Sequence, residues 1–276
     1  MQERWDSRLN ADMWSSFRRH HFGFVAHVIV VRHTGYTFLN RDDWSEMYYF
    51  GGRSDIFYWI LVLVSLALGG LAQLYIRSSY KKWSRVSSGI QGTGADVARR
   101  MLDDEGAQEV GIAHIEGNLT DNYDPRSNML HLSDANFNES SVASIAVACH
   151  EAGHAVQTAR GFWPARLRSA LVPVVNLASA AWIYVFIAGV WLNIAGAAQI
   201  AILLYAATVL FQIVTLPVEI DASRRGLAYL SKHVPSTFNK AGARQVLVAA
   251  ALTYVAAALV SALQLLYLIS NSRNRD

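Results

Sequence analysis

Three long stretches of this chain contain no charged residue, and they constrain its fold more than any other feature. They cover residues 56–76, 169–218 and 245–272, with lengths of 21, 50 and 28 residues. Because about 20 apolar residues cross a bilayer as a helix, these runs predict one, two and one membrane spans. The middle run can fold back near Asn193 and Gly196, where polarity rises without charge. Buried helices of a soluble protein are the alternative, but such helices seldom run this far without a charge.

The overall composition agrees with a membrane protein. Only 16% of the 276 residues are charged and 53% are hydrophobic, whereas a soluble domain averages about 25% charged residues. The net charge of +3 is not gathered in a basic stripe with interleaved aromatic residues, so we expect no nucleic-acid partner. The single cysteine, Cys149, excludes a disulfide within the chain.

Positive charge predicts the side of the membrane on which each segment lies. A cluster of Arg77, Lys81, Lys82 and Arg85 follows the first run closely, and such a cluster favours the cytoplasmic side. Four spans then put both termini outside. The predicted order is an N-terminal extension at 1–55, spans at 56–76, within 169–218 and at 245–270, and cytoplasmic segments at 77–168 and 219–244.

The first of these cytoplasmic segments contains signals for helices and for strands. Residues 93–105 have an apolar helical stripe, and Thr93 can cap that helix. Partial alternation predicts short strands at 110–117 and 127–134, joined by a stretch full of turn-forming residues. A long helix is expected at about 140–160, because a glycine and a proline follow it.

Residues 150–154 read HEAGH, which is the HExxH pattern of zinc peptidases. On a helix, His150 and His154 lie on one face, so both imidazoles can reach one ion. Glu151 is adjacent to the first histidine and can hold a water without binding the metal, which suits a general base. Gly153 costs the helix about 1 kcal/mol against alanine, but it leaves space for the close approach of a metal, a substrate or another helix.

A catalytic zinc takes three protein ligands and leaves a fourth position open, so one ligand must come from another segment. Three further histidines are candidates: His114, His131 and His233. Glu219 is favoured over them, because a carboxylate at the membrane boundary needs a partner. Asp221 is the substitute ligand, although on a helix it would face away from Glu219. The alternative is that Glu219 pairs with Arg224 or Arg225.

Several stretches of the sequence are similar to segments of one known family. They are YKKWS, TGADVARRML, LTDNYDPRSNMLHLS, ACHEAGHAVQ, RLRSALVPVVN, VLFQIVTLPVEIDASRRG and AALTYVAAALVSALQLL. Together, over about residues 56–270, the chain resembles the YugP-type membrane zinc metallopeptidases of bacteria. More distantly, it resembles HtpX and the CaaX prenyl protease, in which a motif downstream of HExxH supplies the third ligand. Carried over, that motif makes Glu219 the third ligand and puts Ser223 where those relatives have an aspartate.

These features predict a mainly α membrane protein with about four transmembrane helices and a small cytoplasmic α+β, zincin-like domain carrying the HExxH helix. The resemblance implies a zinc-dependent endopeptidase of the bacterial plasma membrane, with one Zn²⁺ held by His150, His154 and Glu219. We expect Glu151 to act as general base on membrane-associated or misfolded protein substrates at the cytoplasmic face. The donor to the oxyanion stays open; the candidates for that position or for outer contacts to the ligands are Arg224, Arg225, His233, Ser223 and Tyr229.

Several alternatives remain beside this interpretation. The stretch NMLHLS at 128–133 could bind an extended substrate at an exposed strand edge, or it could pair inside the small sheet. Cys149 could be redox-sensitive, but a small apolar helix residue is the favoured interpretation. A membrane scaffold with a structural metal site would call for four Cys-rich ligands. A metal transporter would need ionisable residues within the spans. The sequence has neither feature.

Overall fold

The computed structural model describes residues 53–192, 194 and 196–273 of the chain. Almost all of the predicted N-terminal extension at 1–55, and the predicted turn residue Asn193, lie outside the described residues. The chain divides into two compact units. Of the described residues, one unit comprises those at 53–70, 173–210 and 257–273, and the other comprises those at 71–172 and 211–256.

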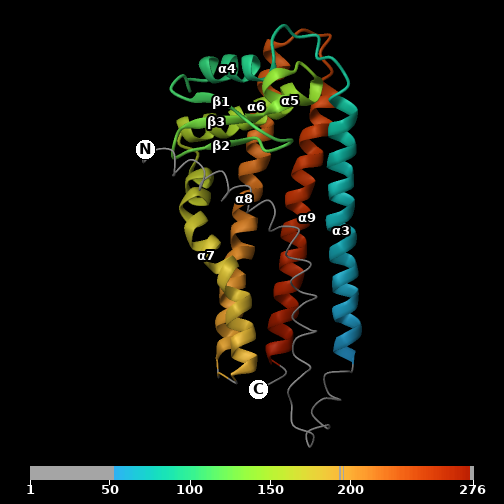
Figure 1. Cartoon of the computed structure of the whole chain (residues 1–276), viewed down its shortest axis with the longest axis vertical. Coiled ribbons are helices and arrows are strands. Elements are labelled where there is room, and N and C mark those ends of the chain that lie inside the picture. The colour runs from blue at the N-terminus through green and yellow to red at the C-terminus, as the bar shows by residue number, and fades with distance from the viewer. Residues whose placement is uncertain (1–52, 193, 195, 274–276) are drawn as a thin grey trace, which may run out of the picture. The chain divides into compact units, whose positions relative to one another are not determined.

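The described part of the chain has four long helices (Figure 1), and each has residues in both units. They are α3 (Arg53–Trp83), α7 (Trp163–Trp191), α8 (Ala197–His233) and α9 (Lys240–Arg273). Each contains a segment long and apolar enough to cross a membrane, which confirms the prediction of four candidate spans. Between α7 and α8, Gly196 has a φ of +82°, a conformation that glycine adopts without steric cost. The chain thus turns back where the sequence predicted.

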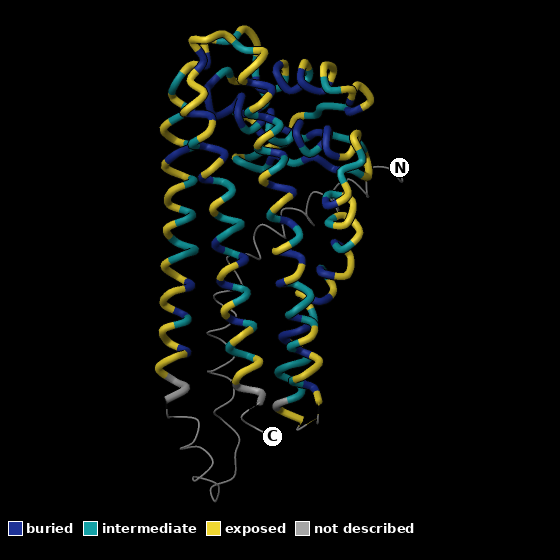
Figure 2. The backbone as a smooth tube through the Cα atoms, turned by 180° about the vertical axis from the view of Figure 1, so that it is seen from behind, coloured by how far each residue is buried: buried dark blue, intermediate teal, exposed yellow. Residues whose placement is uncertain are grey.

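The first unit is held together by side chains of α7, α8 and α9. Trp182 of α7 and Tyr205 of α8 are buried in one apolar cluster, against which α9 packs. The Tyr205 hydroxyl donates to Oε1 of Gln264 on α9 at 2.9 Å, so this polar group is satisfied between the helices. Apolar residues such as Leu177 and Leu203 are 71% and 69% exposed, and exposed stretches (yellow) recur along the long helices in Figure 2. Such an apolar surface suits lipid rather than water.

In the second unit, helix α4 (Gly94–Asp104) confirms the helix predicted at 93–105. A reciprocal pair of hydrogen bonds begins it. Oγ1 of Thr93 accepts from the backbone N–H of Asp96 at 3.3 Å, and the Asp96 carboxylate accepts from the Thr93 N–H at 2.8 Å. This capping box satisfies two backbone donors that a helix start leaves free.

Helix α6 (Val142–Ala159) is the long helix predicted at about 140–160. Ser141 caps it by accepting from the backbone N–H of Ser144 at 3.0 Å, and Gly161, at a φ of +66°, follows its end. A serine at the start and a left-handed glycine just past the end are the common boundaries of a helix. The HExxH residues therefore lie in the middle of a well-bounded helix.

The sheet of the second unit contains β1 (Gly111–Ile115), β2 (Asn122–Asp124) and β3 (Met129–Ser133), in the order β1-β3-β2. β1 is parallel to β3 and β2 is antiparallel to it. The two predicted strands are confirmed as β1 and β3, but β3 is the central strand, so the prediction of a free edge at 128–133 is wrong. β2 was predicted as turn, because three residues are too short to show a period. Pairing with β3 and the burial of Tyr123 stabilise it.

The core of the second unit lies between the sheet, α4, α6 and α8. Leu130 of β3, Met101 of α4 and Ile145 of α6 are fully buried in one cluster, and Tyr229 and Leu230 of α8 belong to the same cluster. The short helix α5 (Asp134–Asn138) connects β3 to α6. This shared core packs the second part of α8 against α6, so the predicted segment at 219–244 begins as the last turns of α8.

Candidate metal centre

The HExxH motif uses the helical period to place two histidines together. The ring centroids of His150 and His154 are 4.8 Å apart, with an angle of 80° between the ring planes. Their side chains are 12% and 11% exposed. Glu151 lies beside His150 on α6 and is half-buried. The two imidazoles can therefore approach one ion from the same helix, with a carboxylate next to them.

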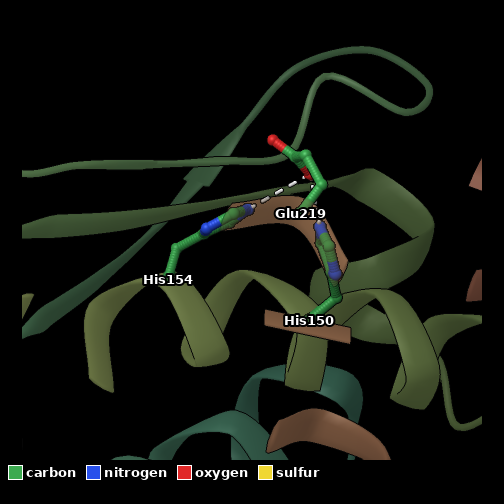
Figure 3. A group of neighbouring side chains, drawn as sticks. All are labelled: His150, His154 and Glu219. Carbon is green, nitrogen blue, oxygen red and sulfur yellow. Dashed lines mark ion pairs between the residues drawn. The ribbon is translucent and has the colours of Figure 1, made fainter. Parts of the chain in front are cut away.

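Glu219 of α8 completes this group from a distant part of the sequence. Its Oε2 lies 3.3 Å from Nε2 of His150 and 3.5 Å from Nε2 of His154 (Figure 3). One ligand atom from each of the three side chains can be chosen so that all lie within 4.8 Å of one another. Glu219, which the sequence favours as the third ligand, thus lies beside both histidines of the motif.

Small residues allow α8 to come this close to α6. A Cβ atom added to Gly153 of α6 would lie 2.6 Å from the carbonyl oxygen of Ala222 on α8. A Cβ atom added to Gly226 of α8 would lie 3.0 Å from the carbonyl oxygen of Cys149 on α6. The glycine inside HEAGH therefore serves helix packing, which was one of the three roles predicted for it, and the packing brings the carboxylate to the histidines.

The chemistry of the three side chains fits a bound cation. Glu219 is 2% exposed, and among the described residues its Oε2 finds no hydrogen-bond donor. A buried carboxylate oxygen without a donor is costly, whereas a cation between this oxygen and two imidazole nitrogens would satisfy all three. Two histidines and one glutamate are a ligand set of catalytic zinc sites. The residues present therefore fit zinc.

Each of the three side chains is also contacted by one further residue on its other side. Nδ1 of His150 lies 3.1 Å from Oγ of Ser223, and Nδ1 of His154 lies 3.1 Å from Oε1 of Gln157. Oε1 of Glu219 lies 3.4 Å from Nη2 of Arg168. Such outer contacts orient metal ligands. Ser223 was a candidate from the sequence, and the structure places it against His150.

Gln157 and Arg168 were missed by the sequence analysis. Gln157 follows His154 by three residues on α6, so helical spacing alone could have identified it. Arg168 directly precedes the second uncharged run, which begins at residue 169. No local signal connects it with Glu219, because the contact depends on how α7 packs beside α8.

Other candidates lie outside the metal-ligand group. The Asp221 carboxylate accepts from Nε of Arg225 at 2.6 Å and from Nε2 of Gln157 at 2.9 Å, so it is committed elsewhere, as its position on the helix predicted. Arg225 also lies over the ring of Phe162. Arg224 is exposed. The alternative pairing of Glu219 with one of these arginines is not what the structure shows, since its cationic neighbour is Arg168.

The remaining histidine candidates and Tyr229 also have other contacts. His114 pairs with Asp134, and His131 lies on the central strand, where burial lowers its pKa. His233 stacks on Tyr229 at 4.3 Å between ring centroids, and the Tyr229 hydroxyl donates to Asp104 at 2.8 Å. Among the contacts of the described residues, none joins these side chains to His150, His154 or Glu219.

Cys149 is a structural residue of α6. It is fully buried, and burial raises the pKa of its thiol to about 12. A thiol with such a pKa is protonated at neutral pH and unreactive, because the thiolate is the nucleophilic form. This supports the interpretation of Cys149 as a small apolar helix residue.

Comparison with known proteins gives two matches that extend over most of the chain. Residues 58–273 match the profile of a family described as "Putative neutral zinc metallopeptidase". The chain is also 40% identical over 207 residues to the "Putative membrane protease YugP" of Bacillus subtilis (strain 168), which covers 75% of this chain and 92% of that protein. No solved structure gives a significant match.

Proposed function

This chain belongs to the neutral zinc metallopeptidase family, and from that premise we propose that it is a membrane-embedded, zinc-dependent endopeptidase. The observation that carries the proposal is the convergence of three side-chain atoms of the kinds that bind zinc on one buried point. These are the Nε2 atoms of His150 and His154 and the Oε2 atom of Glu219. The donorless Oε2 atom calls for a cation, and the set of three leaves a coordination position for substrate or water.

The residues of α6 and α8 divide the chemistry between them. His150, His154 and Glu219 would hold the ion, which when bound polarises the scissile carbonyl and lowers the pKa of a water. Glu151 takes a proton from the attacking water while the water oxygen bonds to the carbonyl carbon. The same carboxyl then gives this proton to the nitrogen as the C–N bond breaks, so that the leaving group departs as a neutral amine.

The substrates proposed are membrane-associated or misfolded proteins, cleaved at the cytoplasmic face. Two features support this location. The motif helix α6 ends four residues before α7, whose candidate span begins at Trp163. The cationic residues at 77–85 favour the cytoplasm for this end of α3. A peptidase site close to the membrane would meet chains that are attached to the bilayer.

The first test is the zinc content of the detergent-purified full-length chain. We expect about one zinc per chain in the wild type, a large loss in Glu219→Ala, and full content in the control His114→Ala, because His114 is paired with Asp134. Glu151→Gln should keep its zinc and lose cleavage of an unfolded protein substrate, because it lacks only the proton acceptor.

Each result has a definite meaning for the proposal. Absence of zinc from the wild type would overturn it, and full zinc in Glu219→Ala would remove Glu219 from the site. Zinc binding by a wild type that cleaves no unfolded or membrane-bound protein would favour a scaffold with a structural metal instead.

A further inference from the structure

Gln157 has an unusual position for an uncharged side chain near a metal site. It is fully buried on α6, and its amide uses both of its ends. Oε1 lies 3.1 Å from Nδ1 of His154, while Nε2 donates to the backbone carbonyl of Val218 at 2.8 Å and to the Asp221 carboxylate at 2.9 Å. One amide thus contacts a motif histidine and two residues that flank Glu219 on α8.

These contacts determine which way the amide points. Val218 O and the Asp221 carboxylate can only accept, so the NH₂ group must face them. A flipped amide would put its oxygen against both acceptors and lose two hydrogen bonds. The amide oxygen therefore faces His154, as the hydrogen-bond network requires.

The direction of the amide in turn determines the tautomer of His154. An amide oxygen only accepts, so Nδ1 of His154 must carry the proton in this contact. In the neutral ring Nε2 then keeps its lone pair, and this is the atom that faces Glu219. His150 has no equivalent constraint, because the hydroxyl of Ser223 can either donate or accept.

We infer that Gln157 is a positioning residue, which holds His154 in the metal-binding tautomer and ties α6 to the segment of α8 that carries Glu219. The inference rests on the proposed function, since it assigns Gln157 a task at the proposed zinc site. Asp221 takes part through this amide, and its contact with Arg225 holds it in place. Asp221, the substitute ligand considered from the sequence, thus acts on His154 indirectly, through Gln157.

The test exchanges the hydrogen-bond pattern while keeping the shapes. Gln157→Glu replaces the NH₂ group by an oxygen that faces two acceptors, one of them a carboxylate. Asp221→Asn restores a donor opposite this oxygen. The variants Gln157→Glu, Asp221→Asn and the double variant are compared with Gln108→Glu, the same change at an exposed glutamine. Zinc affinity is measured by competition with a chelator, and the melting temperature is measured on the metal-free protein.

We expect Gln157→Glu to weaken zinc binding by about ten- to a hundredfold, because the Val218 carbonyl and the Asp221 carboxylate repel its second oxygen and push the side chain out of its place against His154; losing such an outer contact usually costs this much. Asp221→Asn alone should cost less, because its oxygen can still accept from Gln157. The double variant should recover part of the loss in affinity and in melting temperature, because the restored donor takes the position that accepts from Arg225 and leaves the Val218 carbonyl without its donor. Gln108→Glu should match the wild type.

Two results would overturn the inference. One is wild-type zinc affinity in Gln157→Glu. The other is a double variant that binds zinc as weakly, or melts as low, as Gln157→Glu. The loss would then not come from the missing hydrogen-bond donor to Asp221. A wild-type chain that binds no zinc would contradict the proposed function instead, so the two failures can be distinguished.

Discussion

The contact between Gly153 and α8 allows a direct test of how the candidate metal site is built. In Gly153→Ala the new methyl group would lie 2.6 Å from the carbonyl oxygen of Ala222 and 3.2 Å from its carbonyl carbon and Cα. Ordinary van der Waals contact begins at 3.4 Å, so α6 and α8 must separate by about 0.8 Å at this point. All three neighbours are backbone atoms of a packed helix, so no side-chain rotation can relieve the clash.

The expected effect of Gly153→Ala on folding stability is opposite to the effect of helix propensity. In an unconstrained helix, alanine is better than glycine by about 1 kcal/mol. Here overpacking costs about 1–3 kcal/mol, so we expect a net loss of folding stability. The site should suffer more, because a displacement of about 1 Å can cost about a hundredfold in activity. Glu219 is carried by α8, so the separation would move its carboxylate away from both histidines.

Melting temperature and zinc affinity measure the two effects separately. Gly226→Ala is a graded comparison, because its methyl group would lie 3.0 Å from the Cys149 carbonyl oxygen and should cost less. Gly70→Ala in α3 is the control, since nothing lies within 4 Å of its added Cβ, and it should melt at or above the wild-type temperature. If Gly153→Ala melted as high as the wild type and bound zinc equally well, the close helix crossing would not be what positions Glu219.

Three other changes test the surroundings of the site. Arg168→Ala should destabilise the metal-free protein by about 1–3 kcal/mol, because Glu219 loses a cationic neighbour. Added zinc should shrink this difference in melting temperature, and an equal shift with and without zinc would refute the role. Ser223→Ala should weaken zinc binding by up to about tenfold, and Ser223→Asp should restore it by offering His150 a carboxylate acceptor. Equal zinc affinity in the wild type and both variants would show that the contact between Ser223 and His150 does not affect zinc binding. Because the single native cysteine is buried, Ser87→Cys adds one exposed thiol, which in intact cells should react with membrane-permeant reagents alone if this end of α3 is cytoplasmic.

Much of the fold could be predicted because the signals are local. The length of an uncharged run indicates a membrane span whatever lies beside it, and the four candidate spans follow from such runs. Helices α4 and α6 begin at Thr93 and Ser141, which cap the backbone within their own first turn. The short β2 strand could not be predicted, since three residues show no period and the strand depends on its pairing with β3.

The same distinction applies to the metal centre. By itself the sequence determined the pair His150 and His154, because spacing of four residues on a helix puts both rings on one face. It also made Glu219 the best third ligand, from its position at the end of an apolar run and from the family resemblance. Only the tertiary structure decided that Arg168 contacts Glu219, that Gln157 reaches Val218 and Asp221 on α8, and that β3 has no free edge. These are contacts between segments far apart in the chain. They depend on how closely the helices pack; Gly153 and Gly226 allow α6 and α8 to approach closely, but a glycine in the sequence does not show which helix will pack against it.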